Sequence, residues 1–150
     1  MTVNFNEGVL VGYRYYDAHN QEPLFPFGHG LSYTTFRYSD LEVSHTAGEQ
    51  ATVRVKVTNT GAREGAEVAQ LYLGYPAVAQ EPPKQLRGFE KLRLKPGESK
   101  VATMTLDHES LAAWDADTNQ WKVYPGTYSV TVGASSREIS LKGSFTIAGK

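Results

Sequence analysis

The sequence predicts an all-β fold, an antiparallel β-sandwich of the immunoglobulin type with about seven strands. From Phe36 onward, apolar and polar residues alternate with a period of two, which is the pattern of a half-buried strand. Runs of this kind recur at intervals of about 8–12 residues or somewhat more, as expected for such a sandwich. Turn sequences, among them Asn59-Thr60-Gly61 and Pro96-Gly97, separate the runs.

The alternation also assigns a face to most strand residues. Residues 50–59 have a valine face and a polar face, and in residues 67–74 Tyr72 is expected to lie on the face opposite the core. Residues 92–106 are predicted to form two strands around the Pro96-Gly97 turn. The residues expected in the core are Val53, Val55, Val57, Ala69, Leu71, Leu73, Leu92, Leu94, Val101, Met104, Tyr128, Val130, Val132, Ile139, Leu141, Phe145 and Ile147.

Two local features are expected between residues 107 and 121. One turn of helix is predicted near Asp107–Ala113, with Asp107 capping the free amides, and no other helix is predicted. A polar hairpin tip is expected between Trp114 and Trp121.

The chain is predicted to divide into an N-terminal extension, residues 1–35, and the sandwich, residues 36–150. Nine of the 17 aromatic residues fall within the first 40 positions, and prolines and glycines interrupt regular structure there. So much aromatic surface needs a partner, either this chain's own sandwich or another domain. The residues predicted to form a domain interface are Tyr13, Tyr15, Tyr16, Phe25, Phe27 and Tyr33.

The composition argues against several classes of protein. A net charge of −1 does not suit binding to nucleic acid or to a membrane surface, which needs a basic excess. The absence of cysteine excludes disulfides, thiolate nucleophiles and cysteine-ligated zinc. No run approaches the roughly 20 apolar residues of a membrane span, and the N-terminus does not resemble a secretory signal. The compartment is left open.

No metal site or cofactor site is predicted. The four histidines (His19, His29, His45 and His108) lack a ligand spacing, and we expect them to be exposed or locally hydrogen-bonded. The Gly28-His29-Gly30 segment lacks the third glycine, the buried strand and the helix of a phosphate loop. Residues 115–119 begin like a calcium loop, but Gln120 and Gly126 stand where glycine and glutamate are required.

A basic run between residues 84 and 95 is predicted to be the solvent face of a strand rather than a nucleic-acid site. Leucines alternate with the cations, and the opposite face of the strand is expected to be core. The run contains Lys84, Arg87, Lys91, Arg93 and Lys95, interleaved with Leu86, Leu92 and Leu94.

Five segments of the sequence carry a family resemblance: residues 7–17, 23–36, 57–76, 85–99 and 124–136. Together they resemble the C-terminal part of glycoside hydrolase family 3 enzymes, β-glucosidases in particular. Residues 7–17 and 23–36 are similar to the passage out of the family's second, α/β-sandwich domain. Residues 57–76, 85–99 and 124–136 are similar to its fibronectin type III-like domain. In that family the nucleophilic aspartate comes from an N-terminal barrel and the acid/base glutamate usually from the second domain. The resemblance therefore implies a structural appendage, and no catalytic residue is assigned to this chain.

The resulting hypothesis is a non-catalytic accessory domain that stabilises the catalytic domains of a β-glucosidase-like enzyme, its expected partners. An alternative is a module that binds carbohydrate or plant polymer through Tyr13, Tyr15, Tyr16, Trp114 and Trp121, whose rings would stack on sugars. Dimerisation through the aromatic surface is also left open. Glycoside hydrolysis by the chain itself would need two carboxylates about 5–9.5 Å apart across a cleft, which a compact sandwich is not expected to offer.

Overall fold

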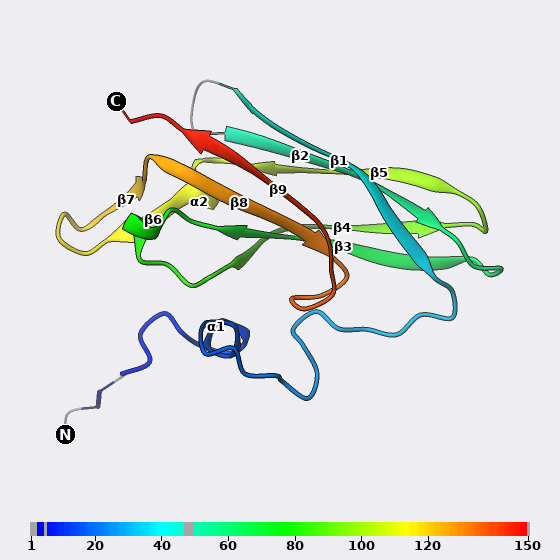
Figure 1. Cartoon of the computed structure of the whole chain (residues 1–150), viewed down its shortest axis with the longest axis horizontal. Helices are drawn as coiled ribbons and strands as arrows, with labels where there is room; N and C mark the ends of the chain where they lie inside the picture. Colours follow the sequence, from blue (N-terminus) through cyan, green and yellow to red (C-terminus); the bar gives the residue numbers. More distant parts are fainter. Residues whose placement is uncertain (1–2, 5, 47–49, 150) are drawn as a thin grey trace.

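A computed structural model describes residues 3–4, 6–46 and 50–149, and its main body is an antiparallel β-sandwich (Figure 1). One sheet has the strand order β1–β2–β5 and the other β4–β3–β8–β9. The prediction of a seven-stranded sandwich is therefore confirmed for the two main sheets. Their strands are β1 (Phe36–Thr46), β2 (Gln50–Asn59), β3 (Gly65–Gly74), β4 (Gln85–Leu94), β5 (Ser99–Leu106), β8 (Gly126–Gly133) and β9 (Ile139–Ile147).

Short elements complete the fold. They are α1 (Tyr13–Ala18), the 3-10 turn η1 (Ala77–Ala79), α2 (His108–Leu111), and the hairpin strands β6 (Ala112–Asp115) and β7 (Gln120–Val123). The predicted cap is confirmed, because the Asp107 carboxylate accepts a hydrogen bond from the Ser110 amide at 2.9 Å. The predicted hairpin is also confirmed, with Trp114 paired to Trp121. The expectation of a single helix was wrong, since α1 was not foreseen.

The core lies between the two sheets and follows the predicted faces closely. The valines of β2, the inward residues of β3 and those of β8 are completely buried in one cluster. Full burial of a side chain of this size contributes about 1.5–3 kcal/mol, so this cluster is the main source of stability. Leu92, Leu94, Met104 and Phe145 are buried as predicted, while Leu141 and Ile147 are partly buried against the cluster.

Val101 is an error in the predicted core. It lies opposite Lys56 in the pairing of β5 with β2, on the solvent face, and 46% of its surface is exposed. The inward position belongs to its neighbour Ala102, which pairs with the buried Val55. Two adjacent apolar residues fit either register, and strand pairing decides between them.

The basic run departs from the predicted alternation at its start. Lys91 and Arg93 are exposed as expected, but the register of β3 against β4 shifts between Leu71 and Tyr72. Arg87 is the extra residue at this bulge, and its guanidinium lies 5.4 Å from the centre of the Tyr75 ring. The bulge turns Leu86 toward the outer face of the sheet, beside Tyr72 rather than toward the core. Lys84 precedes β4 and is largely buried in an ion pair described below.

Asn59, at the end of β2, is completely buried and uses every hydrogen-bonding position of its side chain. Its amide nitrogen donates to the carbonyl oxygens of Arg63 (2.7 Å) and Leu94 (3.0 Å). Its amide oxygen accepts from the Thr34 hydroxyl (2.7 Å) and the Gly61 amide (3.0 Å). One side chain therefore ties together the end of the N-terminal extension, the β2–β3 turn and β4.

A second polar contact joins the two sheets. The Tyr38 hydroxyl of β1 donates a hydrogen bond of 2.7 Å to the Glu67 carboxylate of β3. Burial raises the pKa of Glu67 above its usual value of 4.5, the hydrogen bond from Tyr38 acts in the opposite direction, and the nearby Glu138 raises it further. The folded chain therefore holds this proton at higher pH than the unfolded chain does.

This difference predicts how Glu67 affects stability as the pH changes. Ionisation of the half-buried Glu67 carboxyl disfavours the folded state, so its contribution to stability is lost as pH rises through its raised pKa. Glu67→Gln removes the titration and keeps an acceptor for Tyr38. We expect E67Q to melt at a higher temperature than the unmodified chain at pH 7, with the difference vanishing below about pH 4.5. The exposed Glu42→Gln is the control, and a lower melting temperature for E67Q at pH 7 would contradict the assignment.

Candidate interdomain interface

Residues 12–35 form a strap that runs along the outer face of the four-stranded sheet (Figure 1). Tyr13 anchors it, because its hydroxyl accepts a hydrogen bond of 2.8 Å from the Leu86 amide and its ring meets the Tyr72 ring edge-on at 6.1 Å. Phe27 stacks on the Tyr13 ring, with ring centroids 4.5 Å apart. Tyr72 points away from the core as predicted, yet it is completely buried, because the strap covers it.

Gln70 of β3 fixes the glycine-containing part of the strap. Its amide nitrogen donates to the carbonyl oxygens of Gly28 (3.1 Å) and Ala134 (2.5 Å), and its oxygen accepts from the Tyr72 hydroxyl at 2.6 Å. The Ser136 amide donates to the Phe27 carbonyl at 2.8 Å. Gly28 adopts a φ of +80°, which favours glycine. The segment that faintly resembles a phosphate loop is thus a backbone turn pressed against β3.

Substitution of Gly28 tests this close approach. A Cβ at Gly28 would lie 2.0 Å from the Gln70 side-chain oxygen, on a backbone conformation that side chains disfavour. We expect Gly28→Ala to destabilise the chain by about 1–3 kcal/mol in chemical denaturation. Gly30→Ala, two residues along, is the matched control, because a Cβ there meets nothing within 4 Å. Equal stability of the two variants would show that the strap does not press on β3 at this point.

A cluster of charges holds α1 to two loops of the sandwich. The Asp17 side chain is only 4% exposed and lies 2.7 Å from the Lys84 ammonium and 3.0 Å from Nε of Arg137. The Arg137 guanidinium also donates to the carbonyl oxygens of Gln21 (2.7 Å) and Tyr16 (3.3 Å). Lys84 lies just before β4 and Arg137 lies between β8 and β9, so three distant parts of the sequence meet here.

The strap also has an apolar outer face, which we define as Leu24, Phe25, Leu31 and Tyr33. Their exposed fractions are 91%, 71%, 94% and 92%. Among the described residues, ten of the fifteen exposed large hydrophobic side chains lie between positions 3 and 33. The surface is therefore concentrated at one end of the sequence rather than scattered, as exposed apolar residues usually are.

The six predicted interface residues divide between the two sides of the strap. Tyr13 packs against residues of this chain. Phe27 stacks on Tyr13 and remains about half exposed. Tyr15 and Tyr16 are partly exposed, and Phe25 and Tyr33 are largely exposed. Leu24 and Leu31 are not among the predicted residues, because the prediction rests on the aromatic residues alone. The sequence does contain a signal for them: both leucines lie among prolines and glycines, without the periodic pattern that would place them in the core.

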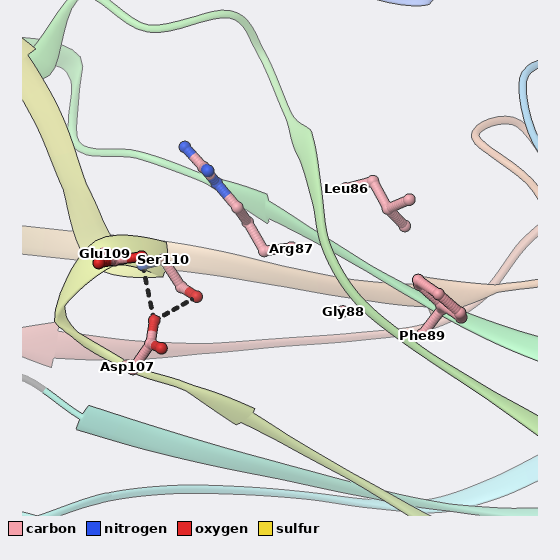
Figure 2. A pocket seen from close by; sticks show the side chains of 7 residues that line it. All are labelled: Leu86, Arg87, Gly88, Phe89, Asp107, Glu109 and Ser110. Atoms are coloured by element: carbon pink, nitrogen blue, oxygen red, sulfur yellow. Dashed lines mark hydrogen bonds between the residues drawn. The ribbon is translucent and has the colours of Figure 1, made fainter.

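The hollow shown in Figure 2 lies between β4 and the start of α2 and does not have the character of a catalytic site. Asp107 is turned toward Ser110, whose side chain and amide donate hydrogen bonds of 2.7 and 2.9 Å to it. These bonds lower the pKa of Asp107, whereas a general acid in a glycosidase needs a raised pKa. The lining residues are Leu86, Arg87, Gly88, Phe89, Asp107, Glu109 and Ser110.

The segment that begins like a calcium loop and two of the histidines make local contacts within the fold. Asp115 accepts hydrogen bonds from the amides of Asp117 (3.1 Å) and Thr118 (3.3 Å), so the segment that begins like a calcium loop is the hairpin turn. His19 lies with Nδ1 2.9 Å from the Tyr15 carbonyl oxygen, and His45 stacks on Phe145. Within the part of the chain that the structure describes, no three His, Cys, Asp or Glu side chains are grouped to hold a metal ion. No described helix is long and apolar enough to cross a bilayer.

Comparison with known proteins identifies the sandwich. The fibronectin type III-like domain family matches residues 67–136. Among solved structures, β-glucosidase D2-BGL from Chaetomella raphigera is 47% identical over 95% of this chain, with a TM-score of 0.90. The β-D-glucoside glucohydrolase from Trichoderma reesei is 41% identical over 96% of it, with a TM-score of 0.92. The chain belongs to the fibronectin type III-like domains of family 3 β-glucosidases.

This fibronectin type III-like domain corresponds to a small part of its relatives. The probable β-glucosidase D of Aspergillus niger is 48% identical over 96% of the chain, which spans only 22% of that protein's length. In the two solved structures the share is 23%. The catalytic domains of the family are therefore absent from this chain, as the resemblance implied.

Proposed function

We propose that this domain stabilises the catalytic domains of a β-glucosidase-like glycoside hydrolase by packing against them. The observation that carries the proposal is the apolar outer face of the strap. A surface of this kind on a domain that spans about a fifth of its relatives' length is typical of a contact with the remaining polypeptide. Full burial of the four side chains would contribute about 6–12 kcal/mol before the costs of association.

The inner side of the strap supports the same proposal. Tyr13, Gly28 and Asp17 are each held by the sandwich, so the outer face is displayed on a rigid support rather than on a loose tail. A pre-ordered surface loses less conformational entropy when it binds, which favours a stable contact between domains.

Mixing the domain with a catalytic portion tests the proposal. D2-BGL lacking the segment that matches this chain provides that portion. We expect the two to elute together in gel filtration, and we expect the domain to raise the thermal midpoint of the catalytic portion and the activity it retains after heating. Separate elution with an unchanged midpoint would contradict the proposal. Elution of the domain alone at twice its mass would support a homodimer through the same surface instead.

A second function is favoured by the β6–β7 hairpin. Trp114 and Trp121 are 48% and 61% exposed, their rings meet edge-on at 5.6 Å, and the tip is fixed by Asp115. Exposed tryptophan rings are suited to stacking on sugars or on aromatic plant polymer. Tyr13 does not contribute to such a platform, because its ring is engaged by contacts with Phe27 and Tyr72.

A pull-down on cellulose, xylan and lignin tests this alternative. If the hairpin binds polymer, the unmodified chain is retained and a variant with both tryptophans changed to alanine is not. Phe89→Ala, which removes another exposed ring, is the control. Equal retention of all three proteins would show that another surface binds the polymer. No retention of any of them would contradict polymer binding by this chain.

A further inference from the structure

The strap is not expected to keep its conformation without contacts to the rest of the chain. Helix α1 has six residues, begins after Gly12 at a φ of 59°, and receives no side-chain cap. Isolated helices shorter than about 12 residues are marginal in water. Contacts with the sandwich must therefore fix α1, and through it the path of the following residues.

The charged contacts around Asp17 can fix α1 on the sandwich. Asp17 is nearly buried and is paired with two cations, while the Arg137 guanidinium reaches two backbone carbonyls on the same segment. A guanidinium has five N–H donors on three nitrogens in a fixed plane, so it can reach a carboxylate and two carbonyl oxygens at separate positions. A single ammonium nitrogen does not reproduce this spread of donors. Removing one partner of a buried ion pair leaves the others uncompensated, so the contact is sensitive to small changes.

We propose that Asp17, Lys84 and Arg137 form a latch that holds the strap on the sandwich and thereby positions the apolar outer face for docking. The latch residues themselves are largely covered, with side chains 4%, 19% and 25% exposed, so they act by orienting the strap rather than by forming the docking surface. The consequence for docking rests on the proposed function, whereas the holding of the strap does not.

Hydrogen exchange on the whole chain tests the holding role directly. In Asp17→Asn, the amides of residues 13–28 are expected to exchange about a hundredfold faster than in the unmodified chain, while those of β2 keep their rates. Arg137→Lys is expected to accelerate the same amides, because it keeps the charge but loses the guanidinium geometry. The controls are Asp117→Asn at the exposed hairpin tip and Arg93→Lys on the solvent face of β4.

The outcomes separate the latch from the proposed function. Unchanged exchange in the strap, or equal acceleration in the strap and β2, would overturn the latch whatever the partner does. If the strap opens in D17N, the variant is also expected to bind the catalytic portion of D2-BGL at least tenfold more weakly. Normal binding with an open strap would overturn the positioning role. Failure of the unmodified chain to bind would instead contradict the proposed function and leave the exchange result to decide the latch.

Discussion

Asn59→Ala is expected to destabilise the folded chain by about 2–4 kcal/mol. Alanine leaves the carbonyl oxygens of Arg63 and Leu94 without their donor, and the Thr34 hydroxyl and the Gly61 amide without their acceptor. Asn59 and its partner Leu94 are completely buried, so water cannot replace the bond to the Leu94 carbonyl oxygen without opening the structure. Urea denaturation followed by circular dichroism measures the change.

The control for this prediction is the neighbouring Thr58→Ala. Thr58 shares one hydrogen bond of 2.8 Å with Ser99 at an exposed site, and its loss is expected to change stability by less than about 0.5 kcal/mol. Similar denaturation midpoints for the two variants would show that the Asn59 contacts are not important for stability.

Deletion of residues 1–35 is expected to lower the free energy of unfolding by about 3 kcal/mol or more. The deletion uncovers the Tyr72 ring and the outer side of Leu86, and it removes the burial of the Tyr13 ring. Each aromatic ring of this kind contributes about 1.5–3 kcal/mol when buried, partly offset by the entropy of ordering the strap. Lys84 and Arg137 also lose their shared carboxylate.

Deletion of residues 1–11 is the matched control, because it leaves every strap contact in place. It is expected to have a small effect, since the described residues of this segment are mostly exposed. If the chain of residues 36–150 instead proves as stable as the whole, the predicted boundary after residue 35 marks an autonomous domain, and the strap belongs to its neighbour.

Much of the sandwich could be predicted because alternation reports burial directly. Val53, Val55 and Val57 form one buried face of β2, as the sequence pattern indicates. The errors arise where tertiary contacts override the pattern. Val101 and Ala102 are both apolar, and only pairing with β2 selects the inward residue. Arg87 sits at a bulge, which breaks the period of two.

The candidate interface was only partly predictable, for a physical reason. An excess of aromatic residues shows that a surface must be covered, but not which side of the segment each ring faces. Tyr13 and Tyr33 look alike in the sequence, yet one is packed on Tyr72 and the other is almost fully exposed. The latch was missed entirely, because Asp17, Lys84 and Arg137 are far apart in the sequence and have no motif.

The most direct test of the domain's proposed role is to make the outer face of the strap polar. A variant with Leu24, Phe25, Leu31 and Tyr33 changed to serine is compared with a control carrying serine at Val78, Phe89 and Val101, which are exposed elsewhere. We predict that the strap variant keeps the thermal midpoint of the free domain but no longer raises that of the D2-BGL catalytic portion, while the control still does. Equal stabilisation by both variants would contradict the proposed role of this surface.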